Sequence, residues 1–290
     1  MTHTPLDALL RLFISGDALY VGLGAVVIAC ALWVPSPKKW RGGVASVLAL
    51  LGGVLVILSA APLAPWVYAV WCVLLAQGML VAGSSKRGRR TRLAAVALLV
   101  AGSIAMALLE LPYRRGPGVV LPRSGSLCVI GDSLCIGSDK QEQNWPELLA
   151  ARADLAIHNH SFGGAKVGSA RHNAKRVPAG TDFVIIEVSG NDLLAGTKRA
   201  SYEAQLDELL STVAERADQV CLVETPLPPF HNRYGRVQRT LAKKHESPLL
   251  PKRYLAGVLA AEGATTDGLH LSVRGHKLLA ETFWRVLRPQ

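Results

Sequence analysis

The chain has 290 residues, half of them hydrophobic, and carries a formal charge of +11. A basic chain would ordinarily suggest nucleic acid as a partner, but the charge is unevenly distributed. Residues 1–119 hold eleven Lys and Arg against three acids, whereas residues 120–290 hold twenty-one against eighteen. The excess stands between apolar stretches, which is typical of a membrane protein and argues against a nucleic-acid-binding face.

Four apolar segments without a charged side chain are predicted to be transmembrane helices. They cover about residues 18–34, 43–60, 64–82 and 93–109. Each is about long enough to cross a hydrocarbon core of about 30 Å. Buried core helices are the alternative, but four in succession without a polar face are hard to place in water. We therefore expect an all-α membrane anchor over residues 1–110, preceded within that range by a short interfacial helix at 5–14.

The loops between these segments predict an orientation. Basic residues gather in the first and third loops, namely Lys38, Lys39 and Arg41, and Lys86, Arg87, Arg89, Arg90 and Arg92. Such an excess is typical of cytoplasmic loops, and the short second loop carries no charge. Everything after the fourth segment is therefore expected outside the cytoplasm. Because the segments hold no acid, base or histidine that could mark an ion path, a tether is favoured over a transporter.

Residues 111–125 are rich in Pro and Gly and are predicted to be a linker. From residue 126 the pattern changes to short apolar runs that alternate with helical stretches. The predicted strands are 127–130, 156–160, 183–188, 220–223 and 248–250, and the predicted helices are 145–152, 202–217, 234–244 and 275–287. Such alternation predicts an α/β domain over residues 126–290, with a parallel sheet covered on both faces.

The sequence Gly131-Asp132-Ser133-Leu134 follows the first predicted strand and precedes a segment that could start a helix. A serine at such a turn presents its hydroxyl and its N–H in the same direction, and a helix N-terminus favours an oxyanion. Acyl-transfer enzymes place a nucleophile in this setting. A turn serine that caps a helix is the commoner role of an isolated Gly-Asp-Ser, so this motif leaves both interpretations open.

Three further motifs carry groups that such chemistry needs. Gly163-Gly164, after the second strand, could offer an N–H to a ligand or form a plain tight turn. Ser189-Gly190-Asn191-Asp192 follows the third strand. Near the end of the chain, Asp267 stands three residues before His270, close enough to set the tautomer of the imidazole. With Ser133 these two residues give a nucleophile, an orienting acid and a base.

Taken together, the four motifs resemble the SGNH hydrolases, also called the GDSL family, over about residues 126–288. The resemblance implies a flavodoxin-like three-layer domain with five parallel strands in the order 2-1-3-4-5. It also implies that Ser133 is the nucleophile, that His270 is the general base and then the acid, and that Asp267 orients His270.

The oxyanion hole implied by the resemblance comprises the N–H groups of Ser133 and Gly164 and the side-chain amide of Asn191. Gly163 is the alternative to Gly164 if the turn differs by one residue. The third motif usually begins with Gly and here begins with Ser189, which we expect to matter little because Asn191 carries the chemistry.

Other conspicuous residues predict neither a cofactor nor a metal. His158 and His160 share a face of a strand, as metal ligands could, but no third ligand is evident, so packing beneath the site is favoured. Cys128 and Cys221 would be separated by the third strand, beyond disulfide reach, so these two and Cys135 are expected to be free, buried thiols.

Two segments of the domain could contact a substrate. The basic residues that follow the glycine pair could face an anionic substrate, although a solvated surface is more common for such residues: Lys166, Arg171, His172, Lys175 and Arg176. The segment 226–230 is rich in Pro and follows the fourth strand. We expect it to overhang the carboxyl edge of the sheet and to select the substrate.

The sequence as a whole predicts a membrane-anchored serine esterase that acts outside the cytoplasm through an acyl-enzyme. The expected substrate is an O-acetyl or other acyl ester of a cell-surface glycan or lipid, because the anchor keeps the site near such molecules. An acyltransferase that passes the acyl group to a sugar, and a non-catalytic binding or scaffold protein, are the alternatives. Hydrolysis is favoured over transfer, since the anchor lacks the polar intramembrane residues that moving an acyl donor would need.

Overall fold

The structure is a computed structural model that describes residues 5–34, 39–82, 88–137 and 143–288. It contains two compact units, which are described in turn. The first unit comprises Met1–Arg11, Arg115–Leu227 and Arg233–Gln290, and the second comprises Leu12–Arg114 and Pro228–Asn232.

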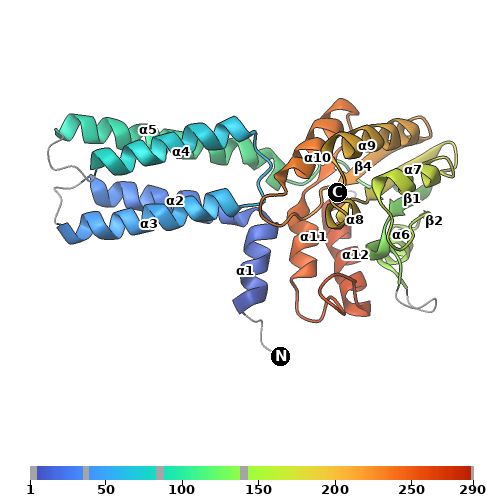
Figure 1. Ribbon diagram of the computed structural model, residues 1–290. Coiled ribbons are helices and arrows are strands. Elements are labelled where there is room, and N and C mark those ends of the chain that lie inside the picture. The colour runs from blue at the N-terminus through green and yellow to red at the C-terminus, as the bar shows by residue number, and fades with distance from the viewer. Residues whose placement is uncertain (1–4, 35–38, 83–87, 138–142, 289–290) are drawn as a thin grey trace. The chain divides into compact units, whose positions relative to one another are not determined.

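Four helices of the second unit correspond to the four predicted apolar segments, and Figure 1 shows them lying side by side. They are α2 (Asp17–Trp33), α3 (Lys39–Leu58), α4 (Pro65–Ala82) and α5 (Arg89–Glu110). Among the described residues, Trp40–Leu58 and Arg89–Arg114 are long and apolar enough to cross a membrane. The stretch Pro65–Val81 is a shorter apolar helix. Helices are therefore present at all four places, while length and composition support a membrane span for fewer of them.

Helix α1 (Pro5–Ile14) precedes α2 where a short helix was predicted. The two helices are bent by 92° at the break between them and would make a third span if counted as one. Gly16 lies at this break with a φ of +83°, a left-handed conformation that favours glycine. Of the basic loop residues that predict the orientation, Lys38, Lys86, Arg87 and the side chain of Lys39 lie outside the described residues.

Helices α2 and α3 approach each other closely through a pair of glycines. A Cβ atom added to Gly22 would lie 2.5 Å from the carbonyl oxygen of Gly52, and one added to Gly52 would lie 2.6 Å from that of Gly22. Small residues that let helix backbones approach are typical of membrane helix interfaces, where close packing drives association. The two glycines therefore set the distance between α2 and α3.

Gly22→Ala should destabilise the helical unit by about 1–3 kcal/mol, because the added methyl group meets backbone that cannot move independently. Gly24→Ala is the matched control on the same helix, since nothing lies within 4 Å of a Cβ atom added there. Thermal unfolding of the purified full chain in detergent measures the difference. Equal unfolding temperatures for the two variants would contradict the close approach.

The first unit contains a five-stranded parallel sheet in the order β2-β1-β3-β4-β5, as the family resemblance implies. Its strands are β1 (Ser126–Gly131), β2 (Ala156–Asn159), β3 (Thr181–Glu187), β4 (Ala217–Val223) and β5 (Leu249–Leu250). All five predicted strands are confirmed. Cys128 pairs with Val184 on β3, and Cys221 pairs with Ile185 from the other side, so the two cysteines are separated as expected and are free.

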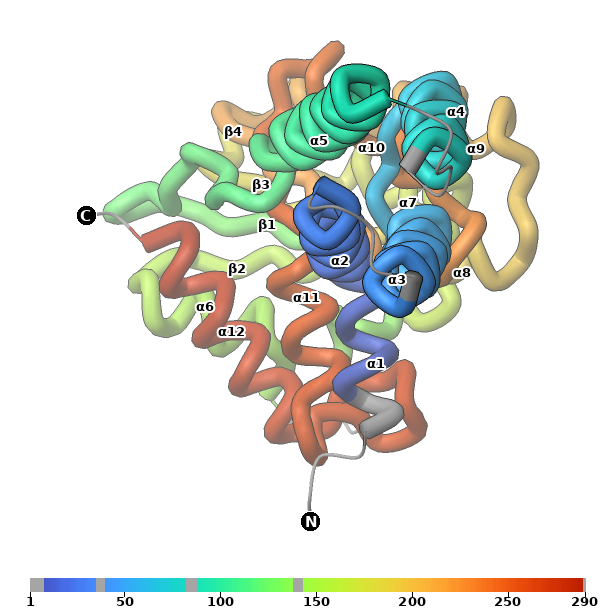
Figure 2. The backbone as a smooth tube through the Cα atoms, turned by 90° about the vertical axis from the view of Figure 1, so that its left-hand side faces the viewer, coloured from blue at the N-terminus to red at the C-terminus, as the bar shows by residue number. Residues whose placement is uncertain are grey.

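One face of the sheet is covered by α6 (Trp145–Ala153), α11 (Lys252–Leu259) and α12 (Val273–Leu287), which Figure 2 shows gathered together. Alternate strand residues such as Leu127 and Phe183 join their core. The rings of Trp145 and Phe283 meet edge to face, with centroids 5.0 Å apart, and this contact ties α6 to α12.

The opposite layer contains α7 (Val167–Ala174), α9 (Arg199–Ala214) and α10 (Asn232–Lys244). Helix α7 packs on α9 and β1, while Tyr202 of α9 meets Tyr234 of α10 edge to face. The predicted helix 202–217 is wrong at its end, because Ala217 already begins β4. Helices α7 and α11 were not predicted.

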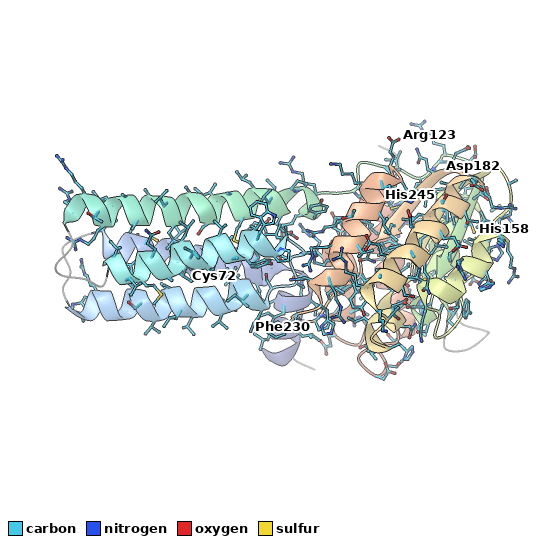
Figure 3. All side chains as sticks on the ribbon, turned by 45° about the horizontal axis from the view of Figure 1, so that its top comes forward. Cys72, Arg123, His158, Asp182, Phe230 and His245 are labelled. Carbon is cyan, nitrogen blue, oxygen red and sulfur yellow. The ribbon has the colours of Figure 1, made fainter. Side chains whose placement is uncertain are left out.

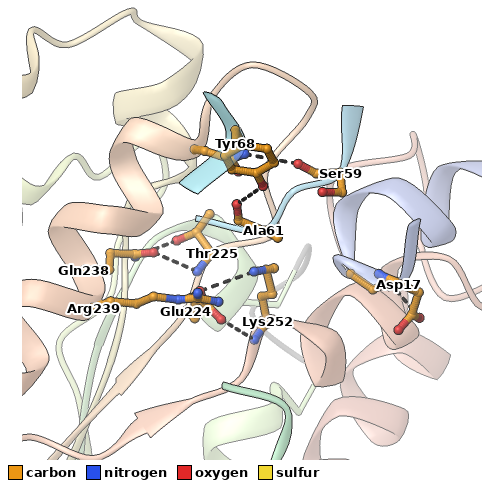
Figure 4. A network of polar contacts seen from close by, with 11 residues as sticks. Asp17, Ser59, Ala61, Tyr68, Glu224, Thr225, Gln238, Arg239 and Lys252 are labelled. Carbon is orange, nitrogen blue, oxygen red and sulfur yellow. Dashed lines mark hydrogen bonds and ion pairs between the residues drawn. The ribbon is translucent and has the colours of Figure 1, made fainter. Parts of the chain in front are cut away.

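Polar contacts fasten the strands at both ends, and those after β4 are buried. At the start of β1, Ser126 donates to Asp182 from its backbone N–H, at 2.8 Å, and from its hydroxyl, at 2.9 Å (Figure 3 labels Asp182). After β4, the carboxylate of Glu224 accepts from Arg239 at 2.8 Å and from Lys252 at 3.3 Å (Figure 4). Burial by itself would raise the pKa of Glu224, but the charges of Lys252 and Arg239 hold that pKa below its usual value.

Candidate active site

Ser133 begins a single turn of 3-10 helix, η2 (Ser133–Cys135), directly after β1. The longer helix start that the sequence suggested is therefore reduced to one turn. Asp132 caps this turn, because its Oδ1 accepts the N–H of Leu134 at 2.9 Å. Ser133 is half-buried and lies on a turn with a fixed backbone.

The turn lies so close to the sheet that only glycine fits at position 131. A Cβ atom on Gly131 would lie 2.2 Å from Cys135 Sγ and 2.9 Å from the carbonyl oxygen of Glu187. From the other side, Asn159 Nδ2 donates to the carbonyl oxygen of Cys135 at 2.9 Å. The backbone that carries Ser133 is thus held by β1, by β3 and by the end of β2.

Gly164 and Asn191 lie close to the turn of Ser133. Asn191 is on α8 (Gly190–Leu194), and its Nδ2 donates to Asp132 Oδ2 at 3.2 Å and to the carbonyl oxygen of Ala165 at 3.1 Å. Asp132 precedes Ser133 and Ala165 follows Gly164, so Asn191 is hydrogen-bonded to a neighbour of each of these two residues. Gly164 has a φ of +72°, which distinguishes it from Gly163 and favours glycine.

Ser189, which stands where the family usually has glycine, matters more than the sequence suggested. Its φ of +149° lies in the region that favours glycine. Its hydroxyl is 2.7 Å from the hydroxyl of Tyr202 and accepts from Gln238 Nε2 at 3.2 Å. These buried contacts hold a strained residue two positions before Asn191.

Asp267 and His270 are hydrogen-bonded to each other on the loop that precedes α12. His270 Nδ1 lies 2.7 Å from Asp267 Oδ2, and Asp267 Oδ1 accepts the N–H of His270 at 2.8 Å and that of Leu269 at 2.9 Å. The hydrogen bonds from His270 and Leu269 hold the pKa of Asp267 far below its usual value. Both side chains are about half exposed.

Electrostatics link His270 to the turn of Ser133. Burial raises the pKa of Asp132 to about 6, and the positive charge of His270 opposes that rise. A charge acts in this way only over a short distance in a partly buried site. The charge of the predicted base therefore acts on the residue next to the predicted nucleophile.

His158 lies on β2, which ends at Asn159, and His160 follows it. The rings of His158 and His160 are stacked, with centroids 6.5 Å apart, and Figure 3 labels His158. Burial, together with the charges of Arg176 and His158, lowers the pKa of His160. Within the described ranges, no group of three or more His, Cys, Asp or Glu could hold a metal ion.

The two segments that could contact a substrate have different surroundings. Arg171 forms an exposed ion pair with Glu208 at 2.5 Å, which agrees with a solvated surface. At the start of α7, the backbone N–H of Lys166 donates to Ser169 Oγ at 3.0 Å. Phe230, in the segment 226–230 that follows β4, is 73% exposed and has a φ of +68°. A role of this segment in substrate selection stays a prediction.

Two features of the site were not found from the sequence. Glu187 is buried at the end of β3, where it pairs in register with Gly131. The detectable signal was a single acid that ends an otherwise apolar run. The second feature is a set of exposed apolar side chains on the loops of the site: Phe162, Leu194 and Leu269.

Several known proteins are similar to this chain in sequence. Residues 129–278 match the GDSL-like Lipase/Acylhydrolase family. Esterase TesA of Pseudomonas aeruginosa is 28% identical over 208 residues, which cover 67% of this chain and 98% of that protein. The thioesterase 1/protease 1/lysophospholipase L1 of Escherichia coli is 26% identical over 57% of this chain and 84% of that protein. The crystal structure of TesA has a TM-score of 0.49 and 29% identity, and the match covers 57% of this chain and 98% of that one.

The chain belongs to the GDSL-like lipase and acylhydrolase family, since the family match spans more than half of it. Members related to it at this level are esterases and thioesterases. The protein is accordingly a serine hydrolase of the SGNH type that acts on ester bonds.

Gly131→Ala should destabilise the protein by about 1–3 kcal/mol, because the new methyl group would overlap Cys135 Sγ and the backbone of β3. Gly190→Ala is the matched control, since its Cβ atom would make an ordinary contact of 3.5 Å with Asp132 Oδ2. Thermal unfolding of both variants is the measurement. A fully stable Gly131→Ala protein would show that the turn has room that the structure does not give it.

Proposed function

We propose that the protein is a membrane-anchored esterase whose hydrolase domain lies outside the cytoplasm, with Ser133 as nucleophile, His270 as base and Asp267 as the acid that orients the base. The hydrogen bond from His270 Nδ1 to Asp267, together with the charge of His270 felt at Asp132, carries this proposal. The first observation joins two residues of one loop, and the second links that loop to a turn that is distant in sequence.

In the first step, Ser133 Oγ attacks the carbonyl carbon of the ester while its proton passes to Nε2 of His270. Asp267 holds Nδ1–H, so that Nε2 is free to accept, and its carboxylate stabilises the imidazolium that forms. The N–H groups of Ser133 and Gly164 and the amide of Asn191 donate to the oxyanion. When the tetrahedral intermediate collapses, the alcohol leaves with the proton from His270, and an acyl-enzyme remains.

In the second step, water attacks the acyl-enzyme and gives its proton to His270. The second tetrahedral intermediate releases the carboxylic acid, and the proton returns to Ser133 Oγ. Each bond that forms is therefore matched by one that breaks, and the protein ends as it began. A sugar hydroxyl in place of water would make the same cycle an acyl transfer.

The proposed substrate is an acyl ester of a lipid or of a cell-surface glycan. Phe162, Leu194 and Leu269 are 37%, 69% and 57% exposed. Leu194 ends α8, which carries Asn191, and the other two lie on loops that carry Gly164 and His270. Exposed apolar side chains around a site suit an apolar ligand. They support a lipid substrate with an apolar acyl chain over an acetylated glycan. The lysophospholipase name of the Escherichia coli relative points the same way.

Ser133→Ala and His270→Ala should each remove nearly all ester hydrolysis, and the double variant should be hardly worse, because the residues act as a unit. Asp267→Ala should retain more activity than either, since only the orientation of the base is lost. The measurement is turnover of short-chain aryl esters, with labelling of Ser133 by a fluorophosphonate probe.

Folded protein that neither hydrolyses these esters nor takes up the probe would overturn the esterase proposal and favour a binding protein. Product analysis with an added sugar acceptor separates hydrolysis from transfer.

A reporter that is active only outside the cytoplasm should be active when fused after Gln290, because the basic loops favour the cytoplasm. A tag inserted beside Arg89, the first residue of α5, should be accessible only from the cytoplasmic side. Protease protection in sealed vesicles gives an independent reading. A cytoplasmic C-terminus would exclude cell-surface substrates.

A further inference from the structure

A cluster of three buried titratable side chains lies directly beneath the turn of Ser133. Asp132 and Cys135 belong to the turn, and Glu187 is the last residue of β3. Their exposed fractions are 3%, 0% and 2%. Because β1 and β3 are parallel and Gly131 pairs with Glu187, the register itself brings Glu187 beside Asp132.

The contacts within the cluster favour a single shared proton. The carboxyl groups of Asp132 and Glu187 are both buried, and the strand register brings the two residues together. Two ionised carboxylates have no hydrogen-bond donor between them, whereas a pair with one proton has one. Two adjacent buried negative charges would also be costly, which favours the same single-proton state.

The surroundings place this proton on Glu187. Each oxygen of Asp132 already accepts an N–H, Oδ1 from Leu134 at 2.9 Å and Oδ2 from Asn191 at 3.2 Å, and the charge of His270 favours its anion. Glu187 instead faces the negative charge of Asp132. It also accepts from Cys135 Sγ at 3.3 Å, a contact that a carbonyl oxygen can make.

We infer that Glu187 is a permanently protonated positioning residue that donates its hydrogen to Asp132, so that Asp132 in turn holds the turn of Ser133 and the amide of Asn191. The inference rests on the proposed function only in that Asn191 and the N–H of Ser133 stabilise the oxyanion. Glu187 touches neither substrate nor reacting atoms, and it acts through Asp132.

Electrostatic effects on the cluster agree with this assignment. Burial, followed by the charge of Asp132, raises the pKa of Glu187 well above its usual value. Burial and the charge of Asp132 likewise raise the pKa of the Cys135 thiol, which therefore stays a donor. Asp192, on α8, raises the pKa of Asp132, whereas His270 lowers it. The charges of Asp192 and His270 therefore act in opposite directions on the ionised form of Asp132.

The test compares substitutions of Glu187 with a substitution of Asp132. Glu187→Leu removes the donor, and kcat should fall by on the order of ten- to a hundredfold with little change in KM, because the oxyanion donors are displaced. Glu187→Gln restores a donor and a carbonyl oxygen without charge, so it should rescue most of this loss. Asp132→Asn should not be rescued in the same way, because an amide has a single acceptor oxygen and cannot serve both Leu134 and Asn191.

Infrared spectroscopy of the full chain in detergent gives a readout that is independent of activity. Near neutral pH, the wild type should show the carbonyl band of a buried protonated carboxyl group, and Glu187→Gln should lose it. A folded wild type without this band, or a Glu187→Gln variant as impaired as Glu187→Leu, would overturn the inference. If Ser133→Ala keeps full esterase activity, the proposed function fails, while the infrared band still decides the state of Glu187.

Discussion

The close approach of β1 to β3 is the constraint on which the site depends. Where the two parallel strands end, Gly131 lies against the backbone of Glu187 and the sulfur of Cys135, with no room for a side chain. The strands can therefore end at the same level, and the segments that follow them meet. Asp132 and Asn191 come into hydrogen-bond contact for this reason, although 59 positions separate them in sequence.

Much of the fold could be predicted from the sequence because the strands are apolar and short. The runs that became β1 and β3 are nearly free of polar residues, as strands buried on both faces must be. Helix α7 escaped prediction because its sequence, from Val167 to Ala174, is polar and short, and its position is set by packing on α9 and β1. The end of α9 was placed too late because Ala217 suits a helix as well as a strand.

The candidate site was predictable in its residue types but not in its supports. Asp267 and His270 could be paired from their spacing, and their hydrogen bond is present. The strained φ of Ser189 has no signature in the sequence alone, because it arises from contacts with distant segments. The burial of Glu187 is indicated there only by a single acid that ends an apolar run. For residues 1–110, composition predicted helices correctly. Spanning length depends on where each helix begins and ends, which is the least predictable property.

The proposed base and nucleophile belong to parts of the fold that differ in rigidity. Ser133 follows a central strand, whereas His270 lies on a loop closed by a single bridge between Thr265 and Leu271 and by backbone bonds such as Ser272 N–H to Ala264 at 2.9 Å. Loops with half-exposed side chains open at a lower free energy than core strands. Mild heating would thus inactivate the enzyme reversibly while its sheet stays intact, and the temperature ceiling of catalysis would be set by this loop rather than by the melting of the domain.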